Sequence, residues 1–420
     1  MPRRSAVTLA ELAAATALTV TVAPTTAAPL IPGSPMPEPM APIVTPDWSG
    51  LDVRTPENLP DLPAESGVPL QDVPLAEAQR MPSGGSTQQR FVYSTVDQHG
   101  EIAASTAAVF LPTGEAPEGG WPVLAWAHGT TGLGNDCTPS AQVRSDRDVG
   151  FLNHWLEQGY AVVASDYAGM GTPGLMSYLN GKVTADNVVD SVAAARGLDS
   201  VDAQLSDTWA VIGQSQGGGA ALHVAHKASA RSAEVGLDYR GAVATGAPAY
   251  VEELVLAGSP SFPPVALPDT LNAYVAYILA GFREAHPEVD LSSALTQEGR
   301  RVADLAETMC LDEMSENLSG KVLSGLFNRP LREVPGFAAA LRDYMAIPTD
   351  GYDKPVFLGH GLTDIDVPFS IGVALNSEMW VRQFTGGNEQ VEVHRYPTDH
   401  SGAMLASVAD STPFLQRIMG

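Results

Sequence analysis

The feature that most constrains this chain is a Gly-Gln-Ser-Gln-Gly motif at positions 213–217. An apolar run at 208–212 precedes it, and a run of small residues with helical character follows at 218–227. The motif alone can arise by chance, but strand, turn and helix together are the context of a nucleophile elbow, in which a serine projects from a strained turn. The flanking glycines fit, because a Cβ has no room where the helix doubles back against the strand. We therefore expect Ser215 to be a nucleophile.

Predicted strands and helices alternate on both sides of this motif. The sequence predicts an antiparallel pair of strands at 89–96 and 101–111, followed by strands at 122–127, 160–165, 208–212, 240–247, 355–358 and 390–396. Helices are predicted at 148–158, 185–197, 218–227 and 369–384, and from 404 onward. This spacing is typical of a doubly wound sheet. The predicted fold class is α/β, an α/β-hydrolase fold with a mostly parallel central sheet flanked by helices.

The alternation breaks between about 250 and 346, where helical periodicity replaces strands. Apolar residues in 271–282 recur in steps of three and one, as in an amphipathic helix, and 299–310 and 334–344 look similar. An insertion of roughly a hundred residues forms a cap rather than a loop. We predict a hydrolase core at 83–249 and 347–420, with a helical cap or lid at 250–346 before the strand that carries the acid.

Two segments precede the core. Residues 1–28 have the pattern of a secretory signal peptide: Arg3 and Arg4, a short apolar stretch, and small residues through Ala28. Residues 29–82 are rich in proline and lack a sustained period, which predicts an extended N-terminal arm. No other stretch is long and apolar enough to span a bilayer. We expect a secreted, extracellular protein without integral membrane association.

The charge balance excludes some partners. The chain of 420 residues carries 23 Lys and Arg against 48 Asp and Glu, a formal net charge of −25. Nucleic acid and anionic membrane surfaces would both repel such a chain. We expect no nucleic-acid partner, a small-molecule ester or lipid as substrate, and a monomer.

Cys137 and Cys310 are the only cysteines. In an oxidising compartment the simplest interpretation is one structural disulfide, and two buried thiols are the alternative. Their spacing matches no zinc pattern. No metal and no cofactor are expected.

A serine nucleophile needs a histidine to take its proton. In α/β hydrolases the acid and then the histidine follow the serine along the chain, each after the carboxyl end of a strand. Two histidines follow the region where the acid is expected. His394 lies within a predicted strand, where it would pack or face solvent, whereas His400 lies in the loop before the last helix. We assign His400 as the base.

Three carboxylates compete for the role of the acid. Asp364 is the first to follow the strand at 355–358. Asp366 leads into the next helix, where an aspartate is commonly a cap. Asp399 adjoins His400 in the sequence and would readily face away from it. We assign Asp364.

The oxyanion that forms during ester cleavage needs two N–H donors. The backbone of Gln216 is the first, because an amide at the start of a helix has no partner within that helix. For the second donor we choose Thr130 in the loop at 128–132, with Thr131 as the alternative. His128 is more simply a structural residue that fixes this loop. Asp166 either caps its own loop or acts at the mouth of the site.

Together these motifs resemble the secretory lipase family, the lipase A type of α/β hydrolase, in its actinobacterial branch. The likeness runs from about residue 80 to the end. The motifs are Ala-His-Gly-Thr-Thr-Gly at 127–132, the cysteine at 137, Ser-Asp-Tyr-Ala-Gly-Met-Gly at 165–171, Gly-Gln-Ser-Gln-Gly at 213–217, Gly-Leu-Thr-Asp-Ile-Asp-Val-Pro at 361–368 and Asp-His-Ser-Gly at 399–402.

The resemblance implies a secreted, metal-free lipase or esterase with a helical cap over an acyl tunnel. It carries the nucleophile to Ser215, the acid to Asp364 and the base to His400, and it supports a Cys137–Cys310 bridge. The expected substrates are lipids or esters with short to medium acyl chains. An acyltransferase with the same triad and a non-catalytic lipid-binding module are alternatives, whereas a prolyl-type peptidase would need propeller repeats that the chain lacks.

Overall fold

The computed structural model describes residues 46–201, 203–264 and 267–420. The predicted signal peptide and the first part of the predicted arm, up to residue 45, lie outside the described residues.

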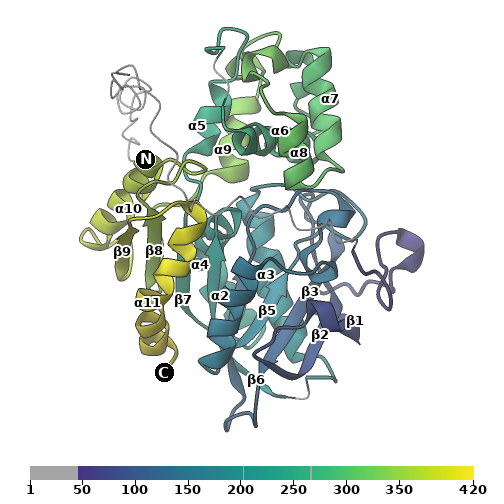
Figure 1. The fold of residues 1–420 in the computed structure, drawn as a ribbon, viewed down its shortest axis with the longest axis vertical. Helices are drawn as coiled ribbons and strands as arrows, with labels where there is room; N and C mark the ends of the chain where they lie inside the picture. Colours follow the sequence, from purple (N-terminus) through teal and green to yellow (C-terminus); the bar gives the residue numbers. More distant parts are fainter. Residues whose placement is uncertain (1–45, 202, 265–266) are drawn as a thin grey trace, which may run out of the picture. The chain divides into compact units, whose positions relative to one another are not determined.

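The core of the described chain is one nine-stranded sheet with the order β1-β2-β3-β5-β4-β6-β7-β8-β9 (Figure 1). The first strands pair antiparallel, and β5, β4, β6, β7, β8 and β9 pair parallel. The strands are β1 (Pro69–Pro74), β2 (Gly84–Val96), β3 (Ile102–Pro112), β4 (Trp121–Ala127), β5 (Ala161–Ser165), β6 (Leu205–Gln214), β7 (Asp238–Thr245), β8 (Val356–Gly361) and β9 (Val391–Tyr396). The predicted α/β fold with a mostly parallel sheet is confirmed.

Helices cover both faces of this sheet, which explains why the central strands are apolar almost throughout. Successive residues of β4 belong to two clusters of buried residues, because side chains alternate across a strand. Ala125 packs in the cluster that includes α3 (Gly181–Arg196) and α4 (Gln216–Glu234). Trp126 packs in the cluster that includes α2 (Asp146–Glu157) and α11 (His400–Met419).

A helical segment lies between β7 and β8, as predicted from its periodicity, and contains no strand among its described residues. We call residues 250–346 the cap segment. Its helices are α5 (Val251–Leu256), α6 (Asp269–Ala285), α7 (Gln297–Ala306), α8 (Leu311–Asn317) and α9 (Phe337–Met345). One further helix, α10 (Phe369–Gln383), lies between β8 and β9.

Two boundaries differ from the predictions. The segment predicted to be an extended arm contains β1, which pairs antiparallel with β2. The prolines at both ends of β1, Pro69 and Pro74, are tolerated because β1 is an edge strand. The last helix begins at His400 rather than near Met404, so His400 is its first residue and not a loop residue.

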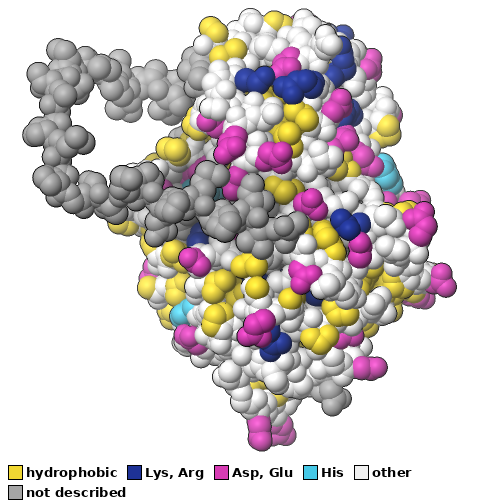
Figure 2. Space-filling model, turned by 45° about the vertical axis from the view of Figure 1, so that its right-hand side comes forward, with side chains coloured by type: hydrophobic (Ala, Val, Ile, Leu, Met, Phe, Trp, Pro, Cys, Tyr) yellow, Lys and Arg dark blue, Asp and Glu magenta, His cyan; other side chains and the backbone are white. Residues whose placement is uncertain are grey.

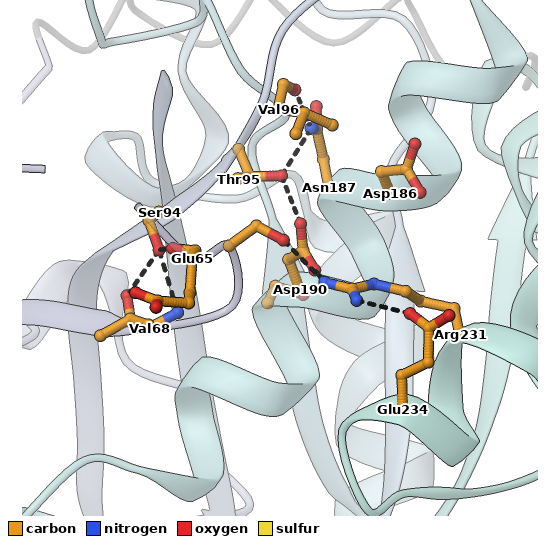
Figure 3. A network of polar contacts seen from close by, with 12 residues as sticks. Glu65, Val68, Ser94, Thr95, Val96, Asp186, Asn187, Asp190, Arg231 and Glu234 are labelled. Atoms are coloured by element: carbon orange, nitrogen blue, oxygen red, sulfur yellow. Dashed lines mark hydrogen bonds and ion pairs between the residues drawn. The ribbon is translucent and has the colours of Figure 1, made fainter. Parts of the chain in front are cut away.

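A buried polar network fixes the chain before β1 against the core (Figure 3). Ser94 Oγ in β2 donates to the Glu65 carbonyl (2.8 Å). On the other side, Asp190 of α3 accepts from Thr95 Oγ1 and from Arg231 of α4, both at 2.9 Å. The Asp190 side chain is only 1% exposed, so Arg231 compensates a charge that has been removed from water.

No helix in the described part of the chain is long and apolar enough to cross a membrane. Acidic side chains are scattered over the face drawn in Figure 2 and are not gathered in one patch.

Candidate active site

Ser215 lies in a strained turn between β6 and α4. Its φ of 59° and ψ of −123° fall in a region that non-glycine residues rarely adopt. A Cβ at Gly217 would lie 1.8 Å from the Ala127 carbonyl oxygen, and one at Gly213 would lie 2.0 Å from the Gly217 carbonyl oxygen. Both positions therefore require glycine, which explains the motif sterically.

The ends of three parallel strands bring distant residues to one edge of the sheet. In the strand register, Gln214 pairs with Thr245, and Thr245 pairs with Gly359. The Ser215 N–H donates to the Thr245 carbonyl (2.9 Å), so the turn is fixed to the end of β7. The loop after β8 carries Asp364 to this same edge.

Asp364 and His400 are joined by a short hydrogen bond. His400 Nδ1 lies 2.6 Å from Asp364 Oδ2, and the Asp364 side chain is fully buried. The other carboxylate oxygen of Asp364 accepts from the backbone N–H groups of Asp366 (3.0 Å) and Val367 (2.8 Å). These bonds fix the carboxylate so that it orients the imidazole.

The second ring nitrogen of His400 is left free. His400 Nε2 is buried and has no hydrogen-bond partner among the described residues. The ring packs against Gly246, where a Cβ would lie 2.8 Å from His400 Cε1. Gly246 directly follows Thr245, which holds the backbone of Ser215. Ser215 and His400 thus flank the end of β7, and hydrogen bonds of a catalytic site often form fully only when substrate binds.

The competing carboxylates are engaged elsewhere. Asp366 Oδ1 accepts from Thr270 Oγ1 (3.0 Å) and the Tyr274 hydroxyl (3.3 Å), both in α6. It therefore contacts the cap segment and does not cap the next helix, whose N-cap is Pro368. Asp399 caps α11 by accepting from the Gly402 N–H (2.8 Å).

The competing histidine is also occupied. The ring of His394 stacks on Phe357, with ring centroids 4.4 Å apart. This agrees with a packing role for His394 in β9.

The loop after β4 passes beside Ser215. A Cβ at Gly129 would lie 3.7 Å from Ser215 Cβ. The next residue, Thr130, places its Oγ1 2.6 Å from the hydroxyl of Tyr178. Thr131 instead accepts at its carbonyl from the Leu311 N–H (2.9 Å). The Thr131 side chain contacts Met170 Sδ (3.8 Å), so Thr130 is the residue of the pair whose side chain bonds Tyr178. Gln216 is the first residue of α4.

His128 and Asp166 hold this loop in place. His128 is buried, its Nδ1 lies 2.7 Å from the Gly129 carbonyl, and its ring stacks on Tyr167. Burial lowers the pKa of His128, so the ring is neutral near pH 7. Asp166 is fully buried and accepts from Thr106 Oγ1 (2.7 Å) and the Ser140 N–H (2.8 Å). Both residues are structural in this arrangement.

Two residues beside the site were not singled out from the sequence. His360 Nε2 lies 3.0 Å from the Val367 carbonyl and 3.6 Å from Asp364 Oδ2, and burial lowers the pKa of this histidine. Its place in the Gly-His-Gly stretch at 359–361 was the available signal. Tyr178 has no motif that marks it.

A disulfide joins the loop after β4 to the cap segment. Cys137 and Cys310 are bonded across 173 positions of sequence. Gly132 also forms an isolated β-bridge with Cys310. No cluster of three or more His, Cys, Asp or Glu suited to a metal is found among the described residues.

Solved structures of other proteins have a similar fold. Lipase A of Candida antarctica superposes with a TM-score of 0.67 at 20% identity, covering 84% of this chain and 82% of that one. The rice cell wall degrading esterase LipA of Xanthomonas oryzae gives 0.65 at 19% identity, covering 85% and 99%. A putative hydrolase of Legionella pneumophila gives 0.65 at 18% identity, covering 83% and 97%. At these identities the likeness shows the α/β-hydrolase fold.

The search of curated proteins found no match. The family model for secretory lipases matches residues 138–393, more than half of the 420 residues. The chain therefore belongs to the secretory lipase family and is a carboxylic ester hydrolase of the lipase and esterase type, as its motifs indicated.

Proposed function

We propose that this protein is a secreted serine carboxylester hydrolase in which Ser215, His400 and Asp364 form the catalytic triad. The observation that carries the proposal is the 2.6 Å bond between the buried Asp364 carboxylate and His400 Nδ1, which leaves Nε2 as the free basic nitrogen. The strained backbone of Ser215, at the adjacent strand end, supports its role as nucleophile.

The reaction follows from these positions. Ser215 Oγ attacks the ester carbonyl while His400 Nε2 takes its proton, and Asp364 stabilises the imidazolium that forms. The N–H of Gln216 and a donor from Thr130 stabilise the oxyanion. His400 then protonates the departing alcohol, and water attacks the acyl-enzyme by the same route.

The proposed substrates are lipids or esters with short to medium acyl chains. A small hollow lies beside α4 next to Gln216, and most of the side chains around it are apolar. Its lining includes Leu179, Ala220, Pro248, Met345 and Ile347. The hollow is far too small to hold an acyl chain in this structure, so the proposed substrate class rests on the secretory lipase family. Secretion is supported by the disulfide, which persists in oxidising compartments, and by the family.

The test combines labelling with two matched variants. A fluorophosphonate should label the wild type and not Ser215→Ala, whose kcat on a soluble nitrophenyl ester should fall by roughly 10⁴-fold or more. Asp364→Asn should cost about 10⁴-fold in kcat, because the wrong imidazole tautomer is then favoured. Asp366→Asn, whose amide oxygen can still accept the bonds from α6, should cost less than about tenfold in kcat. A greater loss in Asp366→Asn would refute the assignment of the acid.

A further inference from the structure

One short stretch of chain contacts both residues assigned to the oxyanion hole. It comprises residues 176–178 in the loop between β5 and α3. The hydroxyl of Tyr178 lies 2.6 Å from Thr130 Oγ1, and the side-chain amide of Gln216 lies 3.9 Å from Met176 Sδ. The two donors come from different parts of the chain, the loop after β4 and the start of α4, so a common neighbour can fix the distance between them.

The position of Tyr178 is fixed from behind by α6 of the cap segment. Tyr178 is 3% exposed, and its ring packs edge-on against Tyr277, with centroids 5.6 Å apart. A Cβ at Gly281 would lie 2.7 Å from the backbone nitrogen of Tyr178, so the backbone of α6 packs directly against the backbone of Tyr178. The next residue, Leu179, has a φ of +62°, a strained value that persists only where the surroundings determine it.

The neighbouring tyrosine hydroxyls of α6 have other partners. The Tyr274 hydroxyl donates to Asp366, and the Tyr277 hydroxyl donates to the Met309 carbonyl within the cap segment. Of these three tyrosines, Tyr178 is the one whose hydroxyl bonds the loop that passes beside Ser215. Burial also raises the pKa of Tyr178 above its usual range, so the phenol keeps its proton and can donate at neutral pH.

We propose that Tyr178 is a positioning residue for the oxyanion hole, whose hydroxyl shares a hydrogen bond with Thr130 Oγ1 and holds Thr130 at the distance that oxyanion binding requires. The inference rests on the proposed function, in which Thr130 supplies the second donor. Oxyanion donors act by being placed in advance where charge develops. The Tyr178 hydroxyl therefore favours the transition state over the bound substrate, and its removal lowers kcat more than it raises KM.

The matched pair of variants is Tyr178→Phe and Tyr277→Phe, in which two packed, buried tyrosines each lose one hydroxyl. Both should lower the melting temperature to a similar extent. Tyr178→Phe should lower kcat on a soluble nitrophenyl ester by about tenfold or more, with KM within about twofold, whereas Tyr277→Phe should keep kcat within about twofold. Equal kcat values in the two variants would overturn the proposal.

A double-mutant cycle separates positioning from general stability. If Tyr178 acts through Thr130, Tyr178→Phe should cost less than about twofold in kcat when Thr130 is already Val. Thr130→Ser keeps the hydroxyl and should therefore retain the sensitivity of kcat to Tyr178→Phe. The Ki of a trifluoromethyl ketone, which forms a tetrahedral oxyanion adduct, should rise by the same factor as kcat/KM falls. The same loss in both Thr130 backgrounds would refute the link.

Failure of the proposed function gives a different result. If Ser215→Ala retained activity and Ser215 were not labelled by the fluorophosphonate, the triad assignment would be wrong, and this inference with it. If Ser215 is labelled and essential while Tyr178→Phe behaves as Tyr277→Phe, the inference alone is wrong.

Discussion

Replacing Gly246 by alanine should disable the site through His400 while leaving the fold intact. Gly246 follows β7, lies between the backbone anchor of Ser215 and the His400 ring, and has a φ of +57°. A methyl group there would lie 2.8 Å from His400 Cε1 and 3.0 Å from His400 Nδ1. The first distance is about 0.6 Å shorter than the 3.4 Å at which ordinary contact begins.

The ring must therefore move by about this amount, and its 2.6 Å bond to Asp364 resists the movement. Misplacement of a catalytic group by about 1 Å can cost roughly 10²-fold in rate. We expect kcat of Gly246→Ala to fall by between about tenfold and 10²-fold. The left-handed backbone adds a loss in unfolding free energy of roughly 1–2 kcal/mol.

Gly236→Ala is the matched control. Gly236 has a φ of +69°, and a Cβ there would meet nothing within 4 Å. It should lose a similar 1–2 kcal/mol of unfolding free energy and keep wild-type kcat. Urea denaturation and initial rates on a soluble nitrophenyl ester give both quantities. If kcat of Gly246→Ala stays within threefold of that of Gly236→Ala, the steric argument about His400 fails.

Two further tests concern stability. Burial lowers the pKa of His223 to about 3, whereas in the unfolded chain this histidine takes up a proton below about pH 6.5. The unfolded chain therefore binds one more proton than the folded chain between about pH 6.5 and pH 3, and the free energy of unfolding falls as the pH falls through this range. Between pH 7.5 and pH 5 His223 should therefore reduce the free energy of unfolding by about 2 kcal/mol. In urea titrations the unfolding free energy of His223→Leu should depend correspondingly less on pH. Arg231→Leu leaves the buried Asp190 without its cation and should lower the unfolding free energy by about 3 kcal/mol. Glu234 pairs with the same arginine, but its side chain is 66% exposed, so Glu234→Gln should change the unfolding free energy by no more than about 0.5 kcal/mol. Equal losses in these two variants would contradict the role assigned to burial.

The sheet and its order along the chain could be predicted from sequence because local periodicity encodes them. The apolar run before Ser215 and the small residues after it specify β6 and α4 without reference to the rest of the molecule. The carboxyl ends of parallel strands share one edge, so the order Ser215, Asp364, His400 already implies a common location. The contact between Asp364 and His400 follows that logic.

Interactions between elements could not be predicted in this way. Asp366 has the sequence context of a helix cap, yet its carboxylate bonds side chains of α6, nearly a hundred positions earlier. β1 could not be predicted because its flanking prolines resemble those of the arm, and only its pairing with β2 makes it a strand. His400 begins α11 because Asp399 caps the helix, and a cap of one residue leaves little periodic signal.

The same distinction explains why the cap segment bears on catalysis. Three of its contacts reach loops beside the proposed active site. α6 bonds Asp366, which lies two residues after Asp364. The disulfide at Cys310 holds the loop that carries Thr130. Gly281 of α6 packs against the backbone of Tyr178. Two of these contacts end on loops that carry a proposed triad or oxyanion residue, and the third ends on the loop that carries Tyr178. A change in the packing of α6 should therefore alter kcat without any change in the residues that touch the substrate.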